Sequence, residues 1–585
     1  MKYFKALVVG GGLAGMRAAV AFNMKNISVG LLSKVHPLRS HSIEAQGGIN
    51  AALGNHPRGK FDSPKLHGYD TVKGSDYLAD QPAVLKFTGL APFIVRQMES
   101  WGVPFSRTPE GKIAQRPFGG AGFPRTCYAA DKTGHVLLHT MWEQVVKYKT
   151  FSERDNMQVF DEWMATRLIV DAGKAVGVIA MNIQTGEIEA FMAEAIVWAT
   201  GGMGRIFKNT TNSLINTGLG MAIPYWAGVP LKDMEFVQYH PTTLLGPNIL
   251  MTEGCRGEGG YLINKNGERF LANYPDSSKS MEISPRDIVS RNIQREIDKG
   301  NGGYPFAGGV KEGDFVGLDL RHLGEEKIQE RLPAIREISI NFAGVDPAYE
   351  PIPIQPGAHY AMGGLDTNEN GQAPEVEGFY AAGEAGCASV HGANRLGGNS
   401  LLETLVFGKI TGEHAADYIQ TKETSVMSSK GYVQEVLEDE KNRLDEMKNR
   451  NGNEKHATIN DELQETMRKN VWIFRDEEHL KVAYDKIQEL KERFKNIGIE
   501  YKGKVMNYDL IWALEVQGNL SVAEAVVAGA LNRKESRGAH FRLEYTKRDD
   551  PNYLKHTIAR WDGEKAKLDW KDVELGIWEP KERKY

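Results

Sequence analysis

The chain has 585 residues with a formal net charge of -5 at pH 7, and 41% of them are hydrophobic. This length predicts about three to four domains with large cores, and the small net charge gives no electrostatic reason to expect nucleic acid or a polybasic membrane anchor. The cysteines, Cys127, Cys255 and Cys387, lie far apart without metal-ligand spacing, so no metal, iron–sulfur or haem site is expected in this chain.

The start of the chain and its apolar runs bear on location. The segment "MKYFKALVVGGGLAGM" leads directly into a strand, unlike a signal peptide. No stretch approaches ~18 uninterrupted apolar residues, so no membrane span is expected. An odd number of cysteines without a secretory signal favours a reducing compartment.

The first motif is a glycine turn of the nucleotide-binding type. Residues 5–22 predict strand, glycine turn and helix, and residues 26–34 predict a second strand, as at the start of a βαβ unit. Gly10, Gly12 and Gly15 form G-x-G-x-x-G between that strand and helix, which lets the backbone approach a pyrophosphate at the helix N-terminus. The alternative is a glycine turn that serves packing alone.

The acidic residue that usually binds the ribose hydroxyls of NAD is missing. Ser33 and Lys34 occupy its place. Ser33 can still hydrogen-bond a ribose, whereas Lys34 meets a phosphate or faces water. Two later strand ends, residues 198–202 ("WATGG") and 380–386 ("YAAGEAG"), also bring backbone close to a large cofactor. The pattern therefore favours FAD over NAD.

Hydrophobic periodicity and turn residues predict the remaining elements. Helices are expected at 77–101, 133–150, 284–299, 322–340 and from about 399. Turns at "DAGK" and "QTGE" predict a β-meander over 157–200 that ends in the apolar strand "AIVWATGG". The segment "YLINKNGERFL" predicts a hairpin, and "GFYAAGEAG" predicts a further buried strand.

These patterns predict a first domain that is interrupted and later resumes. The expected boundaries are 1–233 and 355–412 for the discontinuous first domain, 234–354 for an inserted α+β unit, 413–530 for a helical region and 531–585 for a small C-terminal domain. The helical region is rich in Lys, Glu and Leu, which fits a solvated bundle or part of a docking surface.

Eight short strings occur in order along the chain: "RSHS...QGG", "RPFGG", "AADKTGH", "QYHPT", "MTEGCRGEGG", "AHYAMGG", "HGANRLGGNSLLE" and "RKESRGAH". Together with "RDDPNYLKHT" near the end, they make the chain similar to the flavoprotein subunits of succinate dehydrogenase and quinol:fumarate reductase, over essentially its whole length. The resemblance implies an α/β Rossmann-like FAD-binding domain, an inserted α+β capping domain at 234–354, a helical domain and a small C-terminal domain.

The resemblance assigns a covalent role to His41. In this family the histidine of the "RSH" loop carries FAD through the 8α-methyl group, and a bond of this kind raises the reduction potential of the flavin. The alternative is an unattached loop histidine. Ser42 stands where Thr is usual, and Glu44 stands where Ala is usual and has no predicted role.

Further flavin contacts carry over from the family. Glu384 is expected near the ribityl chain, and Ser400 and Leu401 at the pyrimidine end. Thr217 replaces the usual Asp, so that contact is in doubt. The full set of expected FAD-binding residues is Gly10, Gly12, Leu13, Ala14, Gly15, Ser33, Lys34, Ser40, His41, Ser42, Gln46, Gly47, Gly48, Thr200, Gly201, Thr217, Glu384, Arg395, Ser400 and Leu401.

The resemblance also implies a site for fumarate and succinate. Such dicarboxylates need two clusters of cations or donors, with a proton donor on one face and the flavin on the other, and arginine gives a charged bidentate grip. His240 and Thr252 are expected to contact one carboxylate, and His359 and Arg395 the other. Phe118 is expected to pack against substrate or flavin, although a plain core aromatic is the alternative.

The expected catalytic residues are Arg286, Glu253, Arg256 and His240. The resemblance makes Arg286 the acid that protonates the substrate carbon, with Glu253 and Arg256 as its proton relay, because an arginine of pKa ~12.5 needs prompt reprotonation. Without the family, Arg286 before Asp287 reads as a helix-start ion pair, and His240 as a turn histidine. Cys255 is expected near the site and open to thiol reagents.

The resemblance leaves alternatives for the direction of the reaction and for the branch of the family. L-aspartate oxidase and the soluble flavocytochrome fumarate reductases lack the covalent histidine, and a non-catalytic FAD-binding or assembly protein does not need the full set of arginines. The strings resemble fumarate reductase more closely than succinate dehydrogenase. The family implies an iron–sulfur subunit, a membrane anchor that binds haem or quinone, and a peripheral position on the cytoplasmic side of the cell membrane.

Overall fold

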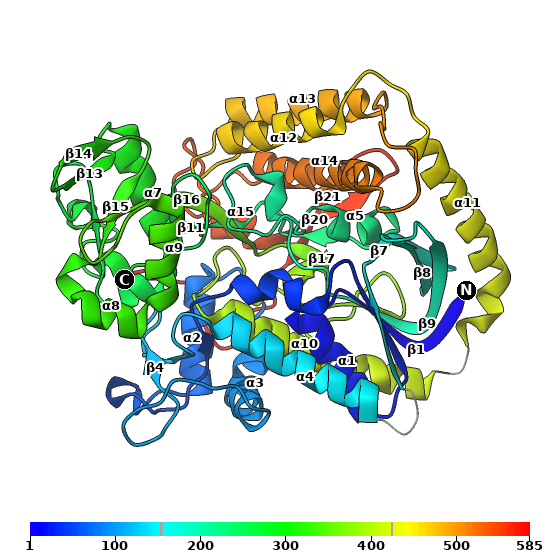
Figure 1. Ribbon diagram of the computed structural model, residues 1–585, viewed down its shortest axis with the longest axis horizontal. Helices are drawn as coiled ribbons and strands as arrows, with labels where there is room; N and C mark the ends of the chain where they lie inside the picture. The colour runs from blue at the N-terminus through cyan, green and yellow to red at the C-terminus, as the bar shows by residue number, and fades with distance from the viewer. Residues whose placement is uncertain (152–155, 423–424, 585) are drawn as a thin grey trace.

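The structure is a computed structural model that describes residues 1–151, 156–422 and 425–584 (Figure 1). Its seven-stranded sheet has the order β6-β2-β1-β9-β8-β7, with β18 beside β9. The strands are β1 (Lys2–Val9), β2 (Val29–Ser33), β6 (Met157–Asp161), β7 (Trp163–Asp171), β8 (Lys174–Asn182), β9 (Ile188–Trp198) and β18 (Phe379–Ala381).

The pairing of these strands brings three strand ends together. β1 pairs in parallel with β2 and β9, with α1 (Leu13–Met24) between β1 and β2, which confirms the βαβ start. β7, β8 and β9 form the predicted antiparallel meander. β18 returns to lie parallel with β9. The carboxyl ends of β1, β9 and β18 therefore meet at one edge, where α/β proteins bind their ligands.

Helices α3 (Gln81–Ser100), α4 (Thr133–Phe151) and α10 (Asn399–Thr421) lie where the periodicity predicts helices or close to it, whereas α2 (Pro64–Gly74) was not predicted. Apolar residues of α1, α3, α4 and α10 share one core with β1 and β2. Figure 1 shows α1, α4 and α10 running side by side along this part of the molecule.

The segment after residue 234 builds a second, six-stranded sheet at the other end of the molecule (Figure 1). Its elements are β11 (Val237–Leu244), β12 (Tyr261–Ile263), β13 (Gly303–Phe306), β14 (Gly309–Glu312), β15 (Val316–Asp319), β16 (Ile352–Ala361), α7 (Arg286–Asp298), α8 (Glu325–Arg331) and α9 (Pro333–Ala343). β11 and β16 pair antiparallel.

Two predictions in this segment are wrong. The "KNGE" turn is present, since Gly267 N–H donates to Asn264 O at 2.9 Å, but β12 pairs with β15 and residues Phe270–Asn273 form a 3-10 helix, so there is no hairpin. The helix expected over 322–340 is two helices, because Pro333 starts α9 and cannot continue α8.

The C-terminal third contributes helices and a second set of strands. α12 (His456–Asn470), α13 (Glu477–Phe494) and α14 (Tyr508–Asn532) pack together, whereas α11 (Lys430–Lys448) lies on the meander. β20 (Lys555–Trp561) and β21 (Ala566–Asp572) extend a sheet that contains β10 (Leu231–Lys232), β17 (Gly364–Asp366) and β19 (Gly386–Cys387). The short elements are β3 (Ile49–Asn50), β4 (Gln115–Arg116), β5 (Thr126–Cys127), α5 (Leu219–Trp226), α6 (Gly254–Gly257) and α15 (Asp550–Tyr553).

Among the described residues, α14 is the one helix long and apolar enough to cross a membrane by length and composition, and 89% of its apolar window is buried inside the protein. Burial of this kind is typical of a core helix.

Candidate active site

A cavity of about 390 Å³ runs from the shared edge of β1, β9 and β18 to the sheet that holds β11 and β16. It brings together all but two of the residues expected from the sequence to contact cofactor or substrate. Gly15 lies behind the glycine turn, and Arg256 lies behind Glu253. The other lining residues among those expected are Gly10, Gly12, Leu13, Ala14, Ser33, Lys34, Ser40, His41, Ser42, Gln46, Gly47, Gly48, Phe118, Thr200, Gly201, Thr217, His240, Thr252, Glu253, Arg286, His359, Glu384, Arg395, Ser400 and Leu401.

The glycine turn is shaped by contact with the end of β9. Gly10 has φ +114°, and a Cβ there would collide with the carbonyl of Ala199. α1 then begins at Leu13 with Gly12 as its N-cap, which has no side chain to cap the helix, and the N–H of Leu13 donates to Ser42 Oγ at 3.4 Å. The first turn of α1 therefore offers backbone N–H groups and the positive end of the helix dipole to an anionic ligand.

The two residues at the end of β2 have partners within the protein. Ser33 Oγ donates to the carbonyl of Val35 at 2.6 Å. Lys34 Nζ forms an ion pair with the carboxylate of Glu515 on α14. Glu515 also lines the cavity, and it was not predicted from the sequence. Lys34 is thus neutralised by protein, which opposes a role as a phosphate anchor.

His41 begins a short 3-10 helix, His41–Glu44, beside the cavity. The backbone N–H of Ser213 donates to its Nδ1 at 3.3 Å. Burial, together with the charge of Arg205, lowers the pKa of His41 to about 4. The imidazole is therefore neutral at physiological pH, and Nδ1 already has a donor.

Glu384 is the buried carboxyl group at the end of β18. Its Oε1 accepts from the backbone N–H of Ala361 at 2.9 Å. Burial raises its pKa to about 8, so the group is mostly protonated at neutral pH and can donate a hydrogen bond.

At the far end of the cavity, the pairing of β11 with β16 places two histidines together. The rings of His240 and His359 lie 5.0 Å apart between centroids. The N–H of Thr242 donates to Nδ1 of His240 at 3.2 Å, and Nδ1 of His359 contacts Thr211 Oγ1 at 2.7 Å. Burial and the charge of Arg286 lower both pKa values well below the usual range, so both rings are neutral.

Two arginines share one acceptor beside these histidines. Gln238 Oε1 accepts from Arg286 Nη1 at 3.1 Å and from Arg395 Nη2 at 3.0 Å. Its amide group donates to Asn394 Oδ1 at 2.9 Å and to the carbonyl of Arg395 at 2.7 Å, which fixes the oxygen toward the arginines. Burial and the charge of Arg286 lower the pKa of Arg395 to about 10, and Arg395 Nε has no hydrogen-bond partner among the described residues.

Glu253 connects Arg286 to Arg256. Its carboxylate accepts from Arg286 Nε at 2.7 Å and from Gly119 N–H at 2.6 Å, and it lies 3.9 Å from Arg256 Nη2. Burial alone would raise the pKa of Glu253, but Arg286 and Arg256 hold it below its usual value. The arrangement differs from a helix-start pair of Arg286 with Asp287, because Arg286 bonds Glu253 and Gln238 instead.

Comparisons with known proteins agree with this geometry. The protein-family model of the FAD binding domain matches residues 5–401, and the family model of the fumarate reductase flavoprotein C-terminus matches residues 460–585. The chain belongs to the fumarate reductase and succinate dehydrogenase flavoprotein family. It is therefore an FAD-dependent oxidoreductase, as the resemblance predicts.

Relatives in this flavoprotein family align over nearly their full length. A fumarate reductase flavoprotein subunit from Serratia sp. is 43% identical over 99% of this chain and 96% of its own. A succinate dehydrogenase flavoprotein subunit from Rickettsia conorii is 43% identical over 98% and 95%. A solved FrdA chain of E. coli quinol fumarate reductase has a TM-score of 0.91 at 42% identity, covering 100% of this chain and 99% of that chain.

The residues fit FAD by the chemistry of their donors. The glycine-rich N-terminus of α1 meets the need of a pyrophosphate, a protonated Glu384 can donate to a hydroxyl or ring atom, and a neutral His41 lies in the same cavity. Thr217 lines the cavity where relatives were expected to have Asp.

Two further expectations concern Phe118 and Cys255. Phe118 is buried against Gly47 and Gly397 and lines the cavity, so it belongs to the site wall. Cys255 is not open to reagents: it is fully buried in the core of the second sheet, and burial raises the pKa of its thiol to about 12. Glu253, the N-cap of α6, lines the cavity, whereas Cys255 within α6 belongs to that core.

Gln238 was not among the residues predicted from the sequence, although it lies in the string "QYHPT". Residues two apart on a strand point to the same face, so the position of His240 already implied that Gln238 faces the site. The strand pattern does not predict that Gln238 also contacts Arg395, because Arg395 lies far away in the chain.

Proposed function

We propose that this chain is the flavoprotein subunit of a membrane-associated quinol:fumarate reductase that interconverts fumarate and succinate. The observation that carries the proposal is the pair Arg286 and Arg395, held on one amide oxygen next to two neutral histidines at the end of an FAD-type cavity. Succinate dehydrogenase is the same chemistry run in the other direction, and relatives of both names share this degree of identity.

Charge supports a dianionic substrate. Arg286, Arg395 and Arg256 bring three positive charges and Glu253 brings one negative charge, while His240 and His359 are neutral. The net charge of this group is therefore two positive charges, which a dicarboxylate neutralises. An isolated ion of either sign in such a buried place would be strongly unfavourable.

Different residues would bind the two carboxylates of the substrate. We assign one carboxylate to Arg395 and His359, with Arg395 Nε as an available donor. We assign the other carboxylate to His240 and Thr252, which also line the cavity. With both carboxylates held, the carbon–carbon double bond of fumarate is fixed between Arg286 and the cofactor.

Arg286 is the proton donor to the substrate carbon during fumarate reduction and the acceptor in the reverse direction. The support for this role is that its guanidinium contacts Glu253, which in turn approaches Arg256. After Arg286 loses its proton, Glu253 and Arg256 return one from the protein side. The Oε1 of Glu253 is held by Gly119, so the carboxylate keeps its orientation while protons move.

FAD would be attached to His41, and the first turn of α1 would hold its pyrophosphate. Bound FAD supplies hydride transfer to or from the substrate carbon. Ser213 occupies Nδ1 of His41, which leaves Nε2 as the ring atom for the bond to the flavin. We assign Glu384 to the ribityl part and Ser400 and Leu401 to the pyrimidine part, as the family resemblance implies; all three line the cavity.

The electrons come from partner subunits. We propose an iron–sulfur subunit, a cytochrome b-type membrane anchor and menaquinol, with the flavoprotein on the cytoplasmic side of the membrane. The support is that solved structures similar to this chain come from quinol–fumarate reductase and succinate dehydrogenase complexes.

The test uses the purified complex in one preparation. Fumarate reduction with reduced viologen is compared with succinate oxidation by a quinone, and aspartate oxidation is measured beside them. A ratio that favours fumarate supports the reductase, and a ratio that favours succinate indicates the dehydrogenase. Turnover of aspartate alone would overturn the proposal. Arg286→Ala should abolish both directions while FAD stays bound, and appreciable activity in it would exclude Arg286 as the proton donor.

A further inference from the structure

The helix that carries Arg286 is tied to the far end of the chain. α7 starts at Arg286, and Asp287 in its first turn is buried. The carboxylate of Asp287 accepts from Arg291 Nη2 at 3.1 Å and from Arg583 Nη2 at 2.7 Å. Burial alone would raise the pKa of Asp287, but Arg583 and Arg291 lower it to about 2, so the carboxylate stays charged.

Arg583 also contacts a residue of the first domain. Its Nε lies 3.3 Å from Asp76 Oδ2, in the loop after α2. Asp76 is itself held by Arg548, whose Nη1 donates to Oδ1 at 2.8 Å, and by Arg537, whose Nη1 donates to the backbone oxygen at 2.9 Å. Arg583 therefore bridges a fixed carboxylate on one side and the start of α7 on the other.

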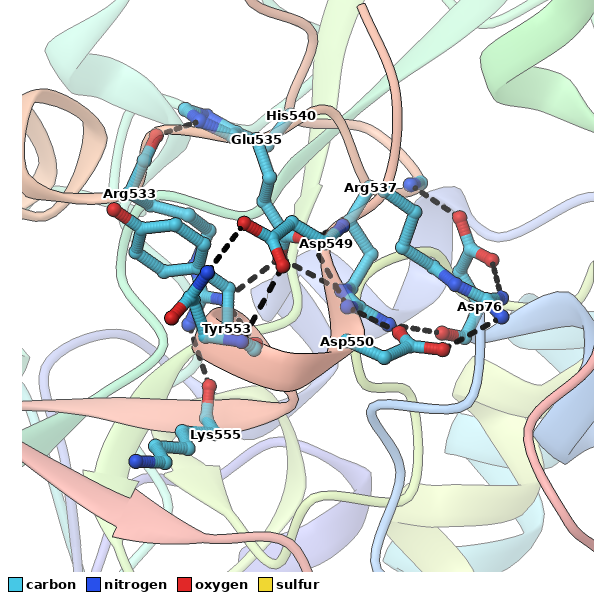
Figure 2. Close-up of polar contacts among 12 residues, drawn as sticks. Asp76, Arg533, Glu535, Arg537, His540, Asp549, Asp550, Tyr553 and Lys555 are labelled. Atoms are coloured by element: carbon cyan, nitrogen blue, oxygen red, sulfur yellow. Dashed lines mark hydrogen bonds and ion pairs between the residues drawn. The ribbon is translucent and has the colours of Figure 1, made fainter. Parts of the chain in front are cut away.

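The network around Asp76 extends through the string "RKESRGAH". Figure 2 shows Asp76 at one end, Arg533 at the other, and Glu535 and Arg537 between them. Glu535 accepts from Arg533 Nη1 at 3.0 Å and from Arg537 Nε at 2.8 Å, and Arg537 also donates to Asp550 at 2.7 Å. The arginine and glutamate side chains of this string are buried, so the network is rigid and not a solvated surface cluster.

The turn at Gly538 touches both elements that carry the site arginines. Its carbonyl accepts from Arg291 Nη1 on α7 at 2.9 Å. The next residue, Ala539, donates its N–H to the carbonyl of Ala393 at 2.9 Å, two residues before Arg395. Gly538 has φ +55°, and a Cβ there would collide with Ala393, so no side chain fits between the turn and that loop.

Hydrogen bonds to its backbone fix the C-terminal segment that carries Arg583. Gln81 pairs with the backbone of Trp578, donating to its oxygen at 2.6 Å and accepting from its N–H at 3.0 Å. Arg548 donates to the carbonyl of Lys581 at 2.9 Å, and Lys73 donates to that of Lys584 at 2.6 Å. The guanidinium of Arg583 is thus presented to Asp76 and Asp287 by an anchored backbone.

We propose that Arg583 is a positioning residue for the reaction: by bridging Asp76 and Asp287 it fixes the first turn of α7 and thereby the guanidinium of Arg286. The inference rests on the proposed function, in which Arg286 delivers the proton. Arg286 meets its acceptors at 2.7 and 3.1 Å on the cavity side. Since a misplacement of about 1 Å can cost about 10²-fold in rate, loss of the anchor behind α7 should slow the reaction even with the contacts on the cavity side intact.

The test compares Arg583→Ala with Arg583→Lys in the assembled complex, using viologen-driven fumarate reduction. For Arg583→Ala we expect kcat to fall by about 10- to 100-fold while KM for fumarate changes by less than about threefold, because Arg395 and His359 still hold the substrate. The solvent deuterium isotope effect on kcat should rise, because proton delivery by Arg286 becomes the slow step. Arg583→Lys, which keeps the charge but loses the two-way grip, should lie between.

Arg560→Ala is the matched control, since Arg560 is a half-exposed arginine of the same C-terminal region that pairs with Glu375 and Asp569. It should leave all three quantities unchanged. Arg583→Ala with the wild-type kcat and isotope effect would overturn the proposal, as would a loss of kcat that only matches a loss of bound flavin. If Arg583→Ala does not assemble, Arg583→Lys decides: a lower kcat with a larger isotope effect supports the bridge, and wild-type values refute it. Failure of the proposed function itself would appear separately, as a wild-type complex that turns over neither fumarate nor succinate.

Discussion

The balance of charge between the two site arginines can be tested at Gln238. Gln238→Glu keeps the shape of the side chain and adds one negative charge, with an oxygen still 3.1 Å from Arg286 Nη1 and 3.0 Å from Arg395 Nη2. Two adjacent guanidinium groups keep a carboxylate ionised there. The second oxygen would replace an amide that now donates to Asn394 and to the carbonyl of Arg395.

The size of the effect follows from those distances. Unit charges about 4 Å apart attract by about 4 kcal/mol at an effective dielectric constant of about 20. That attraction opposes loss of the proton from Arg286, and each 1.36 kcal/mol corresponds to about tenfold in rate, so kcat for fumarate reduction should fall by about 10²- to 10³-fold. The added charge also cancels one of the two net positive charges of the site, so KM for fumarate should rise.

The assay is viologen-driven fumarate reduction as a function of fumarate concentration, with flavin content measured in each preparation. Gln238→Met keeps the volume without the acceptor or the charge, and should lose less activity than Gln238→Glu. Gln434→Glu adds the same charge at an exposed position on α11 and should match the wild type. Wild-type kcat and KM in Gln238→Glu would refute the argument that a neutral acceptor is needed between the arginines.

Three further outcomes are expected. His41→Ala should retain FAD that acid releases, with succinate oxidation lost more completely than fumarate reduction, and acid-stable flavin in that variant would contradict the attachment site. Burial alone would lower the pKa of His556, but Asp233 and Asp80 raise it to about 9. The protonated ring therefore stabilises the fold fully below its unfolded pKa of about 6.5. This stabilisation, about 3 kcal/mol in all, is lost as the pH rises through 9. The thermal midpoint of the wild type should therefore fall over this range by more than that of His556→Gln, and parallel curves would refute the assignment. Cys255 in the native protein should be alkylated at less than about one-tenth of its rate in the unfolded chain, as judged by mass spectrometry, and equal rates would show that the thiol is accessible.

Much of the fold and of the site could be predicted from the sequence because the signals are local. A glycine that must accept φ +114° against Ala199, a helix that begins directly after it, and the alternation that makes β7, β8 and β9 a meander all depend on residues close together in the chain. The order of the short strings likewise located the residues that line the cavity. The direction in which each side chain points was less secure, as Cys255 shows: two residues after the site glutamate Glu253, it faces away from the cavity into a core.

What only the tertiary structure decided is which distant side chains share a buried partner. Gln238 meets the guanidinium of a residue 157 positions later, and Asp287 meets Arg583, 296 positions later. The hydrophobic periodicity near one residue of such a pair does not predict its partner, because the pairing of buried charges depends on how whole strands and helices pack in the tertiary structure. The sequence thus determined the glycine turn and most of the residues that line the cavity, whereas packing of the chain's two ends determined how the charged residues among them are held, since a buried charge is stable only beside its partner.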